Sequence, residues 1–148
     1  MPADATHRPA ALDSDITLTV PARAENIAVV RHVLGALADA LGLAPSVTAD
    51  MRLAVTEACT NVVRHAYAEE DGAIEVVVRP DGDALKVIVA DAGRGVGPSP
   101  DTSGPGLGLP LIAALADSLE IERTGGAGSR LTMSFLRMRA DRVMGVAS

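Results

Sequence analysis

The stretch Ala84-Leu-Lys-Val-Ile-Val-Ala90 runs directly into Asp91-Ala-Gly-Arg-Gly-Val-Gly97, so an alternating apolar run ends at an acidic residue followed by spaced glycines. Alternation of this kind predicts a β-strand that ends near Asp91. A second glycine stretch, Gly104-Pro-Gly-Leu-Gly-Leu-Pro110, opens a helical pattern. Glycine lets the backbone approach a ligand closely, and a helix N-terminus directs free N–H groups at phosphates. The two stretches together indicate a nucleotide-binding site.

The glycine spacing differs from two common nucleotide motifs. The acidic residue precedes the glycines and their spacing is G-x-G-x-G, which is not the dinucleotide fingerprint. No Gly-Lys-Ser/Thr follows, so the stretch is not a P-loop either. Taken alone, the segment Asp91–Gly97 is also explained as an ordinary turn after a strand. The interpretation therefore depends on residues elsewhere in the chain.

Composition limits the classes of function. The 148 residues suit one domain, and a hydrophobic content of 48% with 22% charged residues predicts a folded core. Tyr67 and Phe135 are the only aromatic residues, which argues against a base-stacking platform for nucleic acid. The net charge of −6 argues against binding a polyanion through bulk charge. We therefore expect no direct contact with nucleic acid.

The compartment is predicted from what the sequence lacks. Cys59 is the single cysteine, so the chain has no internal disulfide and no cysteine-based zinc site. The N-terminus has no basic region followed by an apolar core. The most apolar stretch, Val33–Ala44, is short and contains Asp39, which predicts no membrane span. We expect a cytoplasmic protein that does not bind membranes.

Periodicity predicts an α+β fold: a two-layer sandwich of a mixed, mainly antiparallel sheet with helices on one face. Residues 1–14 read as a flexible N-terminal arm, residues 15–137 as a single domain, and residues 138–148 as a flexible C-terminal tail. The expected strands are Asp15–Val20, Ala73–Arg79, Ala84–Ala90, Leu119–Thr124 and Ser129–Leu136, and the expected helices are Glu25–Leu41, Pro45–Tyr67 and Leu109–Asp117.

The predicted helix Pro45–Tyr67 carries three polar side chains beside its apolar face. Its apolar residues recur at helical spacing and predict one buried stripe: Met51, Val55, Ala58, Val62 and Ala66. Glu57, Asn61 and His65 are spaced four apart along the flank of this stripe. Side chains there are expected at the boundary between the core and a cleft.

These stretches, in this order, resemble the sequence boxes of the GHKL, or Bergerat-fold, ATPase superfamily. The segment from Glu57 to Tyr67 looks like the N box, and Asp91–Gly95 resembles the adenine-binding box. Gly104–Leu109 resembles the second glycine box, and Gly126–Ser129 the final one. The resemblance spans roughly Asp15 to Leu136. A stand-alone domain with a short lid is most similar to the anti-sigma factor serine/threonine kinases, in particular their stress-response branch.

The resemblance implies a role for each matching residue. Glu57 would be the catalytic base, Asn61 the ligand of Mg²⁺, and Asp91 the acceptor for the exocyclic amine of adenine. The implied ATP-binding residues are Asn61, His65, Asp91, Gly93, Gly95, Gly97, Gly104, Gly106, Leu107, Gly108, Leu109 and Ser129.

Each of these residues also has a simpler structural interpretation. Asn61 can bond the neighbouring backbone, Glu57 can be a solvated helix residue, and His65 can be a structural histidine. Asp91 can cap a turn, and Ser129 can be an ordinary strand residue. The residues alone leave these alternatives open, and the order of the boxes favours the functional one.

The implied function is an ATP- and Mg²⁺-dependent protein serine/threonine kinase. It would sequester a sigma factor, phosphorylate an anti-anti-sigma protein of the STAS type, and form a homodimer. One alternative is an ATP-gated protein-binding module with little or no kinase activity, because the lid Pro98–Ser103 contains no Arg or Lys. A detached ATP-binding half of a histidine kinase is a third alternative, although His32 lacks the acidic neighbour typical of a phosphoacceptor helix.

Overall fold

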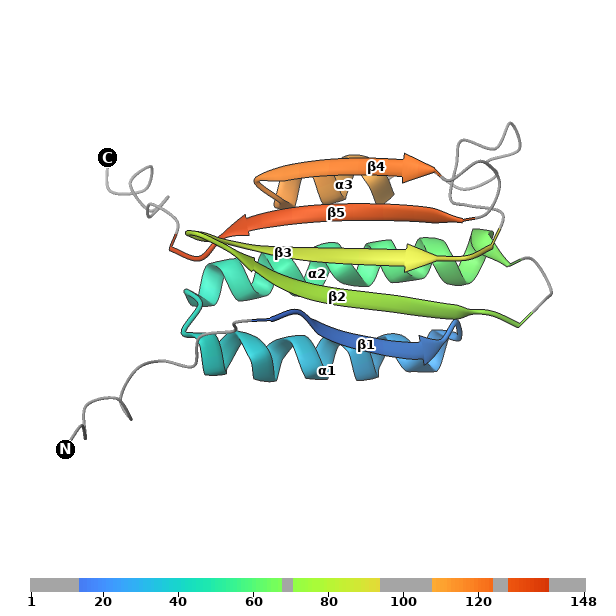
Figure 1. The fold of residues 1–148 in the computed structure, drawn as a ribbon, viewed down its shortest axis with the longest axis horizontal. Helices are drawn as coiled ribbons and strands as arrows, with labels where there is room; N and C mark the ends of the chain where they lie inside the picture. The colour runs from blue at the N-terminus through green and yellow to red at the C-terminus, as the bar shows by residue number, and fades with distance from the viewer. Residues whose placement is uncertain (1–13, 68–70, 94–107, 124–127, 139–148) are drawn as a thin grey trace.

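The computed structural model describes residues 14–67, 71–93, 108–123 and 128–138. These residues form one antiparallel sheet with helices packed on one face (Figure 1). The predicted α+β sandwich is therefore confirmed. The elements in chain order are β1 (Ile16–Pro21), α1 (Ala24–Leu41), α2 (Pro45–Asn61), the π-helix η2 (Val62–Ala66), β2 (Ala73–Asp81), β3 (Ala84–Asp91), α3 (Gly108–Leu115), β4 (Ser118–Arg123) and β5 (Ser129–Leu136).

The sheet has the strand order β1-β2-β3-β5-β4. All four strand pairings among the described residues are antiparallel, where the sequence prediction allowed for a mixed sheet. The pairing of β3 with β5 sets Asp91 directly opposite Ser129. Two residues that are 38 positions apart in the sequence thus meet at one end of the sheet.

The core lies between the sheet and the helices. Met133 and Phe135 of β5 are fully buried, and so are Met51 and Val55 of the predicted stripe on α2. Alternation along β3 buries Leu85, Val87 and Val89 on the same side. Burying aliphatic surface stabilises the fold by about 25 cal/mol per Å². The core that fixes α2 against the sheet therefore also fixes the polar residues on the flank of α2.

The helix ends follow their sequence signals. Gly42 ends α1 with a φ of 69°, a left-handed conformation in which its N–H reaches the carbonyl of Asp39. Pro45 stands at the first position of α2, where its missing N–H removes no helical hydrogen bond.

The end of the second helix differs from the prediction of a regular α-helix to Tyr67. The chain is α-helical to Asn61 and then π-helical from Val62 to Ala66. A π-helix has i→i+5 hydrogen bonds and more residues per turn than an α-helix, so the side chains that follow Asn61 are rotated relative to those of a regular α-helix. Glu57 and Asn61 keep their α-helical spacing, while His65 lies in the π-helix and is exposed. The expected position at the boundary between the core and a cleft is wrong for His65, because its side chain is exposed.

Cys59 faces the core from α2 and is fully buried. Burial disfavours the thiolate and raises the pKa of this thiol to about 12. At the surface, Arg79 of β2 forms an ion pair with Asp15, with Nη2 and Oδ2 2.8 Å apart. In the described part of the chain, no helix combines the length and hydropathy needed to cross a membrane.

Candidate functional site

The Asp91 carboxylate is held by two hydrogen bonds at the end of β3. Its Oδ2 accepts a bond from Ser129 Oγ at 2.6 Å, and its Oδ1 accepts a bond from the Gly93 N–H at 2.9 Å. The residue is 9% exposed. A carboxylate offers about four acceptor positions. With two taken by these neighbours, Asp91 retains capacity to accept a hydrogen bond from a ligand N–H.

Two glycines allow the backbone to pack around Asp91. A Cβ on Gly93 would lie 2.1 Å from the carbonyl oxygen of Ala66, at the end of η2. Gly128 has a φ of +125°, and a Cβ there would lie 2.1 Å from the carbonyl oxygen of Asp91. Both positions therefore require glycine. Gly93 belongs to the predicted site, whereas Gly128 was noted only as part of a glycine box.

Tyr67 is a site residue that the sequence prediction did not assign. Its hydroxyl donates to the Ala73 carbonyl at 2.7 Å and accepts a bond from the Ala92 N–H at 2.9 Å. Its ring lies so close to Gly72 that a Cβ there would be 2.1 Å from a ring carbon. The only sequence signals for this contact are Tyr67 in the quoted N box and glycine at position 72.

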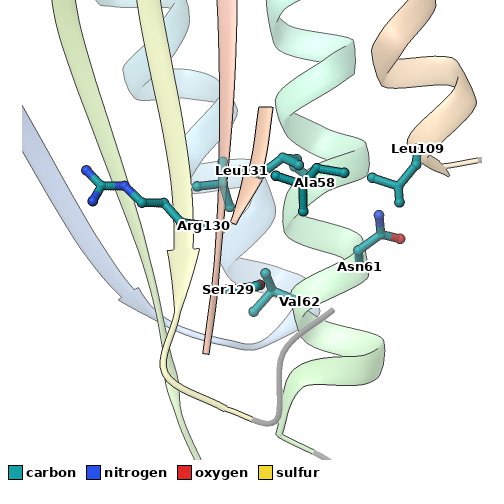
Figure 2. Close-up of a pocket in the computed structure, with 9 residues that line it drawn as sticks. Ala58, Asn61, Val62, Leu109, Ser129, Arg130 and Leu131 are labelled. Carbon is teal, nitrogen blue, oxygen red and sulfur yellow. The ribbon is translucent and has the colours of Figure 1, made fainter. Parts of the chain in front are cut away.

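A small pocket lies between α2, the start of α3 and the part of the sheet formed by β3, β5 and β4. The enclosed space is about 20 Å³, enough for about one water molecule. Figure 2 shows Asn61 directed toward α3 and Leu109, while the Arg130 side chain extends away from them. The lining residues are Ala58, Asn61, Val62, Val89, Leu109, Ile121, Ser129, Arg130 and Leu131.

The Asn61 amide lies against the first residue of α3. A Cβ on Gly108 would lie 3.0 Å from both Nδ2 and Oδ1 of Asn61. Glycine at this position therefore avoids a close contact with the Asn61 amide. The N-terminus of α3 brings the positive end of its dipole to the same place. Among the described residues, no group of three or more His, Cys, Asp or Glu side chains is arranged to hold a metal ion. A metal there would depend on Asn61 together with ligand oxygens and water.

The structure brings only part of the predicted set together. Asn61, Leu109 and Ser129 line the pocket, and Asp91 joins them through its bond to Ser129. Glu57 is half-buried one turn before Asn61 and does not line the pocket. His65 is exposed and does not line it either. Five predicted residues lie outside the described part of the chain: Gly95, Gly97, Gly104, Gly106 and Leu107.

Comparisons with known proteins show which proteins this chain is similar to. Residues 20–135 match the family described as the histidine kinase-like ATPase domain. The chain is 36% identical over 142 residues to the serine-protein kinase RsbW of a Bacillus cereus strain, covering 85% of this chain and 88% of that protein. The serine-protein kinase RsbW of Bacillus thuringiensis subsp. konkukian shows the same identity and coverage.

A solved structure shows the same fold. The crystal structure of the RsbU and RsbW domains of Rv1364c from Mycobacterium tuberculosis superimposes with a TM-score of 0.70 at 26% sequence identity. The match covers 89% of this chain but 35% of that longer chain. The matched family region, residues 20–135, includes every residue of the predicted site.

Proposed function

We propose a mechanism for the site of this chain, which belongs to the histidine kinase-like ATPase domain family and is a protein serine/threonine kinase of the anti-sigma factor type. The enzyme transfers the γ-phosphoryl group of ATP to a serine or threonine of an anti-anti-sigma protein. In its other role it sequesters a sigma factor. The observation that carries the proposal is the fixed Asp91 carboxylate beside a pocket that contains Asn61.

Asp91 supplies the recognition of adenine. Its carboxylate accepts hydrogen bonds only, and Ser129 and Gly93 hold it in one orientation. Adenine offers an exocyclic amine to such an acceptor, whereas guanine has a carbonyl at the same position. The site therefore favours ATP over GTP. With GTP, the guanine carbonyl would face the Asp91 carboxylate, and because both groups only accept hydrogen bonds, a buried group would be left unpaired.

Asn61 and the start of α3 hold the phosphate end of the nucleotide. The amide oxygen of Asn61 is a hard, neutral ligand of the kind that Mg²⁺ accepts alongside phosphate oxygens and water. Bound Mg²⁺ would offset the negative charge of the triphosphate. The N-terminus of α3 at Gly108 directs its positive dipole end to the same region. The lid Pro98–Ser103 has no basic residue, so the charge of the transferred group depends on these contributions.

Glu57 accepts the proton in the transfer step. The serine hydroxyl oxygen of the protein substrate attacks the γ-phosphorus, the bond to the β-phosphate oxygen breaks, and ADP leaves. The hydroxyl proton passes to the Glu57 carboxylate. Glu57 lies one α-helical turn before Asn61 on the same helix. This spacing supports a role for Glu57 as the proton acceptor near Asn61, although Glu57 is not part of the pocket wall.

The regulatory partners are a sigma factor and an STAS-type anti-anti-sigma protein. The nucleotide state and the phosphorylation of the antagonist decide which partner is held. A homodimer is the proposed assembly, with β1 and α1 as the contact. β1 has one neighbour, β2, in the described sheet, so its other edge is open to pairing.

Incubation of the purified chain with γ-labelled ATP, Mg²⁺ and the STAS-domain proteins of its source organism tests the proposal. We expect label on a serine or threonine of one antagonist, identified by mass spectrometry. Unlabelled ATP in excess should abolish the labelling, and excess GTP should not. ATP binding without transfer to any antagonist would overturn the proposed reaction in favour of an ATP-gated binding module.

A further inference from the structure

The first residue of β2 and the turn that follows β3 are joined through a side chain. Glu75 of β2 pairs with Ala90 of β3, so the same register continued by two residues sets Ala73 opposite Ala92. The Tyr67 hydroxyl stands between their backbone groups. It accepts a hydrogen bond from the Ala92 N–H at 2.9 Å and donates one to the Ala73 carbonyl at 2.7 Å. The phenol thus bridges the first residue of β2 and the turn that follows β3.

The position of the Tyr67 ring is fixed by close packing. A Cβ on Gly72 would lie 2.1 Å from one ring carbon, and a Cβ on Gly93 would lie 3.0 Å from another. The Ala66 carbonyl, one residue before Tyr67, packs against Gly93 as well. The backbone at the end of η2 and the ring of the residue that follows it therefore both pack against the Asp91 turn. Glycine at both positions makes room for the ring.

We propose that Tyr67 is a positioning residue for nucleotide recognition, which acts by holding the turn Asp91–Gly93 so that the Asp91 carboxylate keeps its orientation toward the base. The inference rests on the proposed function, because it assigns adenine recognition to Asp91. Two consecutive N–H groups define the turn: that of Ala92 bonds Tyr67, and that of Gly93 bonds Asp91 Oδ1. Loss of the hydrogen bond between the Ala92 N–H and Tyr67 loosens the bond between the Gly93 N–H and Asp91 Oδ1. The Asp91 carboxylate then loses its fixed orientation.

The bridge also links the two ends of the nucleotide site. Asn61 ends α2, η2 follows without a break, and Tyr67 is the next residue. One continuous segment therefore carries the amide proposed for the metal and the hydroxyl that holds the adenine turn. A shift of α2 would be transmitted to the Asp91 turn through Tyr67, so the spacing between the two ends of the site is fixed by this segment.

Tyr67→Phe removes the hydroxyl and keeps the ring, which tests the bridge without opening a cavity. The bridge borders an open groove that includes Tyr67, Gly72, Ala73 and Ala92, so water can reach the two backbone groups left behind. The variant should therefore fold. Thr56→Val is the matched control, because Thr56 Oγ1 also donates to a backbone carbonyl, that of Arg52, at 2.7 Å.

The first measurement is amide hydrogen exchange by NMR on the full chain without nucleotide. We expect exchange at Ala92 and Gly93 to be faster in Tyr67→Phe than in the parent by about 5-fold or more, because one hydrogen bond that closes the turn is lost. Amides in the middle of α1 should be unaffected, and Thr56→Val should leave the turn unchanged. Parent-like exchange at Ala92 in Tyr67→Phe would overturn the bridge.

The second measurement is calorimetry with ATP and with purine riboside triphosphate, which lacks the exocyclic amine. Tyr67→Phe should weaken ATP binding by about 3- to 10-fold, and binding of the analogue by less than about 2-fold. In the background of Asp91→Asn, Tyr67→Phe should add no further loss, because it acts through Asp91. An equal loss for both ligands, or additive losses, would overturn the positioning role and leave a purely structural one.

The two proposals fail in different ways. If the parent binds no ATP, the proposed function is wrong and the nucleotide role of Tyr67 falls with it, while the exchange measurement still decides whether Tyr67 holds the turn. If the parent binds ATP and Tyr67→Phe binds it equally well, only the role of Tyr67 is overturned.

Discussion

The hydroxyl of Ser129 donates a 2.6 Å hydrogen bond to the carboxylate of Asp91, across two strands whose register sets these residues opposite each other. Both residues are more than nine-tenths buried. The orientation of the carboxylate is therefore set partly by the sheet itself, and not only by the loop that follows it. Sites supported by strands hold their geometry better than sites carried by loops alone.

Asp91→Asn should change the base preference of the site. The asparagine amide retains an oxygen that can accept from the Gly93 N–H. Its NH₂ group replaces the second carboxylate oxygen, so a donor stands where Asp91 has an acceptor. We expect ATP binding to weaken by about 1–3 kcal/mol, because the hydrogen bond to the amine is lost, and GTP binding to strengthen, because the amide can donate to the guanine carbonyl. Calorimetry with both nucleotides measures this. Asp81→Asn, at an exposed ion pair with Lys86, is the control, and an equal change for ATP and GTP would contradict the assignment.

Glu57→Gln and Asn61→Ala should separate proton transfer from nucleotide binding. Glu57→Gln should lower the rate of transfer by about 10²- to 10⁴-fold while ATP binding is retained, because a positioned proton acceptor is lost. Asn61→Ala should weaken Mg²⁺-dependent ATP binding as well, because a metal ligand is removed. The two residues lie one turn apart, so matched thermal melts are required before rates are compared. Parent-like transfer by Glu57→Gln would refute its role as the base.

Gly93→Ala should destabilise the fold and abolish tight ATP binding. The new methyl group would meet the Ala66 carbonyl oxygen at 2.1 Å, so η2 and the Asp91 turn must move apart. A loss of about 1–3 kcal/mol in the free energy of unfolding is expected from such overpacking. Gly35→Ala is the control. Gly35 lies within α1, and its new methyl group would meet the Arg52 side chain at an ordinary contact distance of 3.8 Å. That change should stabilise the protein by up to about 1 kcal/mol in urea unfolding.

Asp15→Asn should lower the melting temperature at pH 7 and leave it unchanged at about pH 2. The hydrogen bond from Arg79 lowers the pKa of Asp15 below its usual value of 3.8. A depressed pKa in the folded state stabilises the protein above the unfolded pKa, and the stabilisation is lost as the pH falls through the folded pKa. The pair is exposed, so the effect should be smaller than that of Gly93→Ala. A similar decrease at both pH values would mean that the ion pair is not responsible.

The parts of the fold that depend on local pattern follow from the sequence. β5 occupies Ser129–Leu136 as predicted, and α1 ends at Leu41 before Gly42 as predicted. These elements carry their signals within a few residues, through alternation or a glycine that takes a left-handed conformation. The same is true of Asp91, whose place at a strand end before glycine marks it in the sequence.

The contacts that depend on tertiary packing do not follow from the sequence. The change from α-helix to π-helix after Asn61 has no glycine or proline to mark it. The role of Tyr67 depends on Ala73 and Ala92, which are brought beside it only when β2 and β3 pair. A tyrosine at the end of an amphipathic helix has the same local pattern whether or not its hydroxyl finds such partners.

The burial of Cys59 makes the protein a convenient host for site-specific labels. Its thiol has a pKa of about 12 and is fully buried, so in the folded state it presents almost no thiolate to an alkylating dye. The chain has no other cysteine. A single cysteine introduced at an exposed position such as Ser118, at the start of β4, would therefore take up a fluorophore selectively. Whether this edge strand moves when nucleotide binds becomes measurable without first removing the native thiol, and the packing of α2 against the core is left intact.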